Sequence, residues 1–168
     1  MRARSLLILS FVAMAAAASA DEAFVPLFVI ERSVNGNTVH YDAKLRDGKL
    51  DPQQPVVAYW ILSENGKRQE LNLLERLKAY GFTIKPDKVP ETYRMTLVAD
   101  KNKEIRVFRM GAAVRAEAMI GTCEAYLQKI WVVSKKSFMI NLPEYVDMVG
   151  NDMSTGAECH ERVTPGDR

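Results

Sequence analysis

The two histidines are the first side chains to consider for general-base or metal chemistry, because an imidazole titrates near neutral pH and binds divalent metals. Strand-like alternation places His40 on one face with Asp42 and Lys44, and it places His160 on one face with Arg162. Both faces are polar. The pattern therefore predicts two histidines on the protein surface rather than in a catalytic centre.

The two cysteines show the opposite pattern. Cys123 alternates with Ala125 and Cys159 with Ala157, which predicts side chains that face the interior. A buried thiol is a poor nucleophile, since a reactive thiolate needs an exposed, electropositive setting. The pair is expected either to form a disulfide or to remain two buried thiols. A disulfide would stabilise the fold by about 3 to 4 kcal/mol through the entropy of loop closure. No metal site is expected, because no His or third Cys lies beside either residue at the spacing of zinc sites.

Acidic and arginine side chains offer a second kind of chemistry. Glu31 and Arg32 end an apolar segment, and Glu75 falls in a helical one. With Asp42 they would form the cleft of an envelope enzyme of the hydrolase type if all four converged and a carboxylate pKa were raised. Charged strand ends and solvated helix faces explain the same residues without catalysis. The sequence contains no Gly-x-Ser-x-Gly elbow, phosphate-binding loop, Gly-x-Gly-x-x-Gly, His-Glu-x-x-His or calcium-binding loop, so no catalytic residue and no cofactor is assigned.

Several aromatic side chains could line a binding pocket instead. The small residues Ala112, Ala116 and Ala118 on strand faces could leave room for a ligand inside the domain. We therefore expect a small apolar or amphipathic ligand, and the candidate contact residues are Glu31, Arg32, Tyr41, Tyr59, Trp60 and Tyr80. The alternative is that these aromatics, with Tyr126, fill the core, and that the alanines merely let a helix approach.

The elements that must position these residues are mostly strands. Residues 24–32 and 38–45 flank Asn35-Gly36, a turn dipeptide that favours positive φ, and so predict a β-hairpin. Residues 93–99 and 104–110 predict a second hairpin around a polar turn.

One amphipathic helix is expected over residues 67–80, packed on the sheet. Leu71, Leu74, Leu77 and Tyr80 follow helical spacing there, and Gly81 stands where a C-terminal cap would be.

Nine or ten strands are predicted in all, and the later ones include residues 112–120, 123–133, 138–142, 145–149 and 157–163. Regular short strands separated by turn signals, without a βαβ pattern, are typical of a mainly-β fold. We expect an antiparallel sheet that closes or nearly closes into a barrel, with a two-sheet sandwich as the alternative.

The first twenty residues have the three zones of a Sec-type signal peptide: Arg2 and Arg4, an apolar run over residues 6–18, and small residues up to Ala20. The apolar run is shorter than the roughly 20 residues of a membrane span. We therefore expect cleavage after Ala20, export to the periplasm or beyond the cell, and a single β-rich domain over residues 21–168 without a membrane span.

The net charge narrows the class of partner. The chain of 168 residues carries 23 Lys and Arg against 21 Asp and Glu, a formal charge of +2. Removal of Arg2 and Arg4 with the signal peptide leaves 21 basic residues, so the remaining domain is formally neutral. A neutral domain has no charge-based affinity for nucleic acid or for an anionic membrane. An envelope protein of unknown identity or a small apolar ligand is the expected partner.

Several phrases of the sequence resemble one family. They are Glu31-Arg32-Ser33, Asn35-Gly36-Asn37, Tyr41-Asp42-Ala43, Tyr59-Trp60-Ile61, Leu74-Glu75-Arg76, Ala79-Tyr80-Gly81, Gly150-Asn151-Asp152 and Glu161-Arg162. In these phrases the chain is similar to the exported bacterial family DUF4833, a domain of unknown function. The resemblance implies no activity, ligand or catalytic residue, and the cysteines are not part of it. The expected function is a non-catalytic ligand-binding or protein-interaction module of the bacterial cell envelope, with the envelope enzyme as the alternative.

Overall fold

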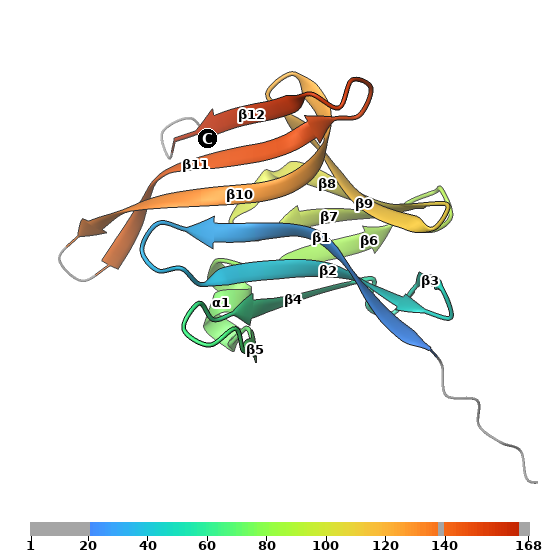
Figure 1. Ribbon diagram of the computed structural model, residues 1–168, viewed down its shortest axis with the longest axis horizontal. Helices are drawn as coiled ribbons and strands as arrows, with labels where there is room; N and C mark the ends of the chain where they lie inside the picture. Colours follow the sequence, from blue (N-terminus) through green and yellow to red (C-terminus); the bar gives the residue numbers. More distant parts are fainter. Residues whose placement is uncertain (1–20, 138–139, 165–168) are drawn as a thin grey trace, which may run out of the picture.

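The structure is a computed structural model that describes residues 21–137 and 140–164. The predicted signal peptide lies outside the described residues, and so does the start of the predicted strand 138–142. Within the described residues the chain is mainly β (Figure 1). Its elements are β1 (Glu22–Arg32), β2 (Thr38–Arg46), β3 (Lys49–Leu50), β4 (Val56–Ile61), β5 (Arg68–Glu70), α1 (Leu73–Lys78), β6 (Phe82–Pro86), β7 (Thr92–Leu97), β8 (Asp100–Met110), β9 (Ala113–Ile120), β10 (Cys123–Ser137), β11 (Ile140–Asp152) and β12 (Glu158–Val163).

One hydrogen-bonded sheet contains all twelve of these strands. Its main path runs β5-β4-β2-β1-β10-β9-β8-β7-β6, while β3 pairs with β2, and β11 and β12 continue from β10. β1 and β10 run parallel, from the pair Val29↔Lys129 to the pair Arg32↔Val132, and the other pairings of the described residues are antiparallel. The prediction of a purely antiparallel sheet is therefore wrong at this junction. No tight turn joins β1 to β10, so local sequence does not dictate their relative direction.

The strand count differs from the predicted nine or ten for local reasons that act in both directions. β3 and β5 are two and three residues long, too short to show alternation. The segments 138–142 and 145–149 are predicted as two strands, whereas the described part of both belongs to β11. Pro143 pairs with Ser134 at a register shift inside that strand, where a residue without an N–H is tolerated.

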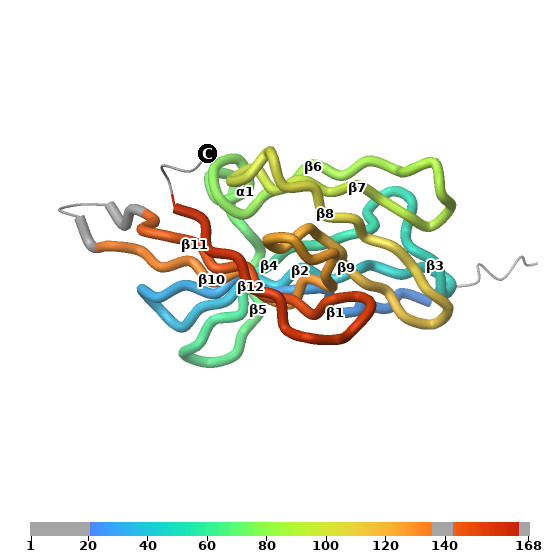
Figure 2. The backbone as a smooth tube through the Cα atoms, turned by 90° about the horizontal axis from the view of Figure 1, so that it is seen from above, coloured from blue at the N-terminus to red at the C-terminus, as the bar shows by residue number. Residues whose placement is uncertain are grey.

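The sheet curls into a half-barrel, as the two views in Figures 1 and 2 show. β4 and β5 lie at one end of the curl and β6 at the other, and the described residues form no backbone pairing between these two edges. The barrel-like expectation is thus confirmed only as a curled half-barrel. The two separate sheets of a sandwich are not seen, because the strands form one sheet.

The inward faces of the strands make the core, as alternation predicts. In β9, Val114, Ala116, Ala118 and Ile120 are buried, whereas Arg115 is exposed. In β2, Val39, Tyr41 and Ala43 are fully buried. The predicted hairpin of β1 and β2 is confirmed, although neither Asn35 nor Gly36 has the positive φ expected of its turn.

The helix differs most from the prediction. α1 begins after Asn72, whose side chain accepts the Glu75 backbone N–H while the Glu75 carboxylate accepts the Asn72 N–H. This capping box leaves Leu71, which is buried, outside the helix. Leu74 and Leu77 are 68% and 61% exposed, and α1 buries none of its residues. The expected amphipathic helix packed on the sheet is therefore wrong, and residues 68–70 form β5 instead.

Gly81 is required for a different reason from the expected helix cap. Ala79 closes the helix by donating its backbone N–H to the Glu75 carbonyl oxygen. A Cβ on Gly81 would overlap the Arg76 carbonyl oxygen. Only glycine lets the chain fold back against the last helical turn and enter β6.

Candidate functional site

A cleft of about 630 Å³ opens where the two unpaired edges of the half-barrel face each other. Its apolar walls come from β4, from β6 and from the connection through α1, and they include Val56, Val57, Ala58, Leu71, Leu77 and Phe82. Its polar lining includes Lys44, Arg68, Glu70 and Arg76. The volume falls in the range of small-molecule sites, about 300 to 1,000 Å³.

The rim of the cleft carries an excess of positive charge. Arg68 and Arg76 both contact the Glu70 carboxylate, at 3.1 and 3.2 Å. The Arg68 guanidinium stacks on the Tyr59 ring, 3.8 Å from its centroid, and Arg76 Nε donates to the Leu71 carbonyl oxygen. Because two guanidinium groups share one carboxylate, this part of the rim can accept a further anionic group.

The β6 edge of the cleft offers main-chain polar groups. The Val98 N–H donates to the Gly81 carbonyl oxygen, and the Asp87 N–H donates to the Thr92 carbonyl oxygen. In the antiparallel β6–β7 register, Gly81 and Asp87 therefore belong to hydrogen-bonded pairs with β7, and Phe82 and Ile84 belong to the alternate, non-hydrogen-bonded pairs. Their N–H and C=O groups therefore point toward the unpaired edge and can bind a polar part of a ligand.

A cluster of aromatic side chains surrounds Arg32 next to the C-terminal end of α1. Arg32 Nη1 donates to the Tyr80 hydroxyl at 2.9 Å, and its guanidinium lies 4.8 Å from the centroid of the Trp60 ring. Trp60 meets Tyr80 edge-on at 4.9 Å, and the Tyr41 hydroxyl donates to the Tyr80 carbonyl oxygen at 2.6 Å. These contacts tie β1, β2 and β4 to the segment that enters β6.

Four of the six predicted ligand contacts thus come together, but inside a packed cluster. Tyr41 and Trp60 are buried, and none of Arg32, Tyr41, Trp60 and Tyr80 lines the cleft. The hydroxyl groups of Tyr41 and Tyr80 form hydrogen bonds within the protein, as is typical of tyrosines in a core. A direct ligand contact of these residues stays a prediction.

The other two predicted contacts, Glu31 and Tyr59, lie apart from this cluster. Glu31 pairs with Lys129 at 3.4 Å across the parallel junction of the sheet. The Tyr59 hydroxyl donates to Asp42 Oδ2 at 2.5 Å, and its ring stacks with His40. Asp42 is buried, so this hydrogen bond satisfies one oxygen of a carboxylate that is shielded from water, while Oδ1 has no hydrogen-bond partner.

The four residues of the enzyme hypothesis each contact a different partner. Glu31 binds Lys129, Asp42 binds Tyr59, and Glu75 caps its own helix, while Arg32 lies in the aromatic cluster. None of the four lines the cleft between β4 and β6.

The histidines stand close to the positions expected of them. His160 is half exposed and lies 3.4 Å from Asp147. Two bonds from Arg162 hold that carboxylate, and they keep the pKa of Asp147 below its usual value. His40 is half-buried and bonds the Thr38 hydroxyl at 3.0 Å.

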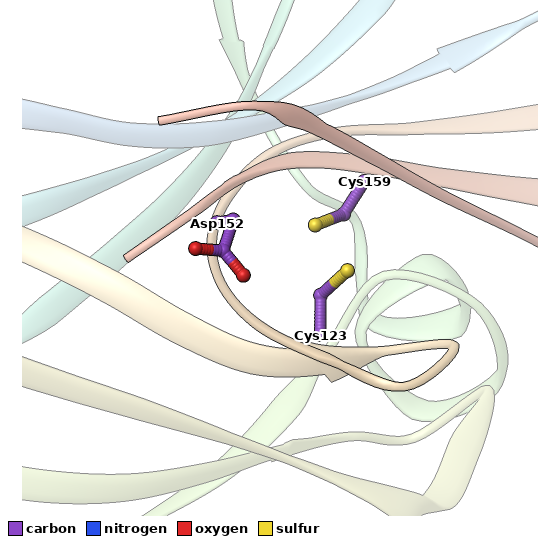
Figure 3. A group of neighbouring side chains, drawn as sticks. All are labelled: Cys123, Asp152 and Cys159. Atoms are coloured by element: carbon purple, nitrogen blue, oxygen red, sulfur yellow. The ribbon is translucent and has the colours of Figure 1, made fainter. Parts of the chain in front are cut away.

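The cysteines are free thiols, and the fold places the side chain of Asp152 next to both of them. Sγ of Cys123, Sγ of Cys159 and a carboxylate oxygen of Asp152 all lie within 4.8 Å of one another (Figure 3). Cys159 is buried and Cys123 is half-buried, so the expected inward facing is confirmed for Cys159 and partly for Cys123. Sequence reasoning missed Asp152, although the turn that follows it, Asp152-Met153-Ser154-Thr155-Gly156, is a visible signal.

Comparison with known families places this geometry in context. Residues 28–162 match the model of the family described as Domain of unknown function (DUF4833). The chain belongs to this family. No curated protein and no solved structure matches it.

The DUF4833 match runs from β1 into β12. It includes the cleft residues named above, the aromatic cluster, and the thiol cluster of Cys123, Asp152 and Cys159. The described part of the DUF4833 chain contains no helix that is long and apolar enough to span a membrane.

The stability of the DUF4833 domain is expected to fall above about pH 10, the ordinary pKa of a tyrosine. Burial, together with the hydrogen bond to Asp42, raises the pKa of Tyr59 to about 12, and burial raises the pKa of Tyr41 further. The unfolded chain therefore releases these protons first, and the free energy of unfolding falls by about 1.4 kcal/mol per pH unit for each tyrosine until its folded pKa is passed. Urea unfolding at several pH values measures this slope. Tyr59→Phe should remove the share of one tyrosine, and an unchanged slope in that variant would contradict the assignment.

Proposed function

We propose that this DUF4833 protein is a non-catalytic binding module of the bacterial cell envelope, and that the cleft between β4 and β6 holds a small amphipathic ligand. The observation that carries the proposal is the open edge of the half-barrel, where a cleft of about 630 Å³ has apolar walls and a cationic rim. Export is supported by the signal-peptide pattern of residues 1–20.

The lining selects the chemistry of the ligand. An apolar body packs against Ala58 and Phe82, which lie on the two facing strands. An acidic group binds at Arg68 and Arg76, because Glu70 alone does not satisfy two guanidinium groups. A molecule with an apolar body and one anionic group fits both surfaces.

Two exposed leucines of α1 differ in whether they line this cleft. Leu77 lines the cleft, whereas Leu73 on the same helix is 73% exposed and does not. Leu77→Ser is expected to weaken the binding of an anionic naphthalene sulfonate dye about fivefold, because the lost apolar contact is worth about 1 kcal/mol. The measurement is a fluorescence titration of the dye, with Leu73→Ser as the matched control.

Equal affinity of both serine variants would place the dye elsewhere and contradict the proposed site. Native mass spectrometry after mild purification gives an independent test, with a retained small ligand as the expected result. Repeated recovery of bare protein, together with no dye binding, would overturn the proposal.

A further inference from the structure

The geometry points to a second site, independent of the cleft, in which Cys123, Asp152 and Cys159 bind a soft divalent metal ion of the zinc or cadmium class. The three ligand atoms come from the start of β10, the end of β11 and the start of β12, and all lie within 4.8 Å of one another. Figure 3 shows the two sulfur atoms side by side, with the Asp152 carboxylate next to them.

The carboxylate of Asp152 is held in place before any ion arrives. Its Oδ1 accepts hydrogen bonds from the backbone N–H and hydroxyl groups of Ser154, at 2.9 and 2.6 Å, and of Thr155, at 2.8 and 2.9 Å. These donors keep the pKa of Asp152 well below its usual value, so the group stays ionised. All four bonds go to Oδ1, which leaves the lone pairs of Oδ2 for a cation.

The two thiols supply the soft part of the site. The hydrogen bond with Cys123 and burial raise the pKa of the Cys159 thiol to about 11, so this proton remains on sulfur when no cation is present. Binding of a divalent ion forms two metal–sulfur bonds and releases the two thiol protons to solvent. Two thiolates and one carboxylate then carry three negative charges around two positive ones.

The spacing suits a tetrahedral ion. A zinc–sulfur bond of about 2.3 Å places two sulfur ligands about 3.7 Å apart. Ligand atoms within 4.8 Å of one another therefore need to close by at most about 1 Å. The half-buried side of the cluster, at Cys123 and Asp152, leaves the fourth position to water.

The role of the Asp152 carboxylate distinguishes the metal-site hypothesis from the disulfide hypothesis. A disulfide would use both sulfur atoms and would give Asp152 no part, whereas a metal ion requires all three side chains. Asp152→Asn is a sharp test, because an amide oxygen can still accept the bonds from Ser154 and Thr155 while its NH₂ group cannot bind a cation.

Titration of the purified, reduced protein with Cd²⁺ alone tests the site. We expect one bound ion, a sulfur-to-cadmium charge-transfer band in the ultraviolet, and release of about two protons. Asp152→Asn should weaken Cd²⁺ binding at least about tenfold. Glu124→Gln is the matched control, since Glu124 is an exposed carboxylate next to Cys123, and it should bind Cd²⁺ as the wild type does.

Three results would overturn the inference. They are the absence of the charge-transfer band, wild-type affinity in Asp152→Asn, and protein that contains no titratable thiol when it is isolated from the cell envelope. The last result would establish the disulfide as the resting state. Circular dichroism of Asp152→Asn without metal checks that the variant keeps its fold.

Discussion

The Trp60→Ala protein is expected to lose about 3 to 5 kcal/mol of unfolding free energy. Trp60 is only 5% exposed, and its ring contacts Tyr80 edge-on and lies under the Arg32 guanidinium. Truncation leaves a cavity in the core and removes the aromatic partner of a guanidinium whose Nε has no hydrogen-bond partner. Because these contacts tie β4 to β1 and to the start of β6, one side of the cleft should loosen as well.

Equilibrium urea unfolding followed by circular dichroism measures the effect. Trp60→Phe should lose less, since it keeps most of the apolar volume. Leu74→Ala should change the unfolding free energy by no more than about 0.5 kcal/mol, because Leu74 is exposed on α1. A loss below about 1 kcal/mol in Trp60→Ala would show that the cluster around Arg32 does not hold the half-barrel together.

The Gly150→Ala protein is expected to be destabilised by about 3 kcal/mol. A Cβ on Gly150 would lie 2.5 Å from the Tyr126 carbonyl oxygen and 2.7 Å from Ile120 Cδ1. The first neighbour is backbone of β10, so relief requires β10 and β11 to separate. Gly150 also pairs with Cys159, so the strain reaches the thiol cluster.

The control for Gly150→Ala is a glycine with room around it. Gly66 has a φ of +67° and no atom within 4 Å of the position of a Cβ, so Gly66→Ala should cost only the 1–2 kcal/mol, roughly, of a left-handed backbone. Amide hydrogen exchange in β11 and β12 should accelerate in Gly150→Ala and stay unchanged in Gly66→Ala. Similar exchange in both variants would contradict the close approach of β10 and β11.

Local patterns predicted the parts of this fold that depend on neighbours in the sequence. The faces of β9 follow strict alternation, and those of β2 follow it except at buried Asp42, because a strand with one buried face must place every second side chain inside. The prediction of a helix over residues 67–80 was wrong, although its true start was also marked locally. Leucines at helical spacing suggested a long helix, but Asn72 and Glu75 carry the capping box that marks its true start.

Contacts between distant segments were outside the reach of such patterns. The parallel pairing of β1 with β10 depends on how the whole sheet curls, since no turn connects the two strands. The two ends of the sheet, at β4 and β5 and at β6, have the same origin, and so does the cleft between them.

The candidate sites divide along the same line. Residue type alone singled out Arg32, Trp60, Tyr80 and the two cysteines, because cations and aromatics can contact a ligand and the chain has only two thiols. The grouping of Arg32 with Trp60 and Tyr80, and the placement of Asp152 beside the thiols, came from tertiary structure. Residue type determines the chemistry of a side chain. Its partners depend on the curl of the sheet, because the curl brings together strands that no local interaction connects.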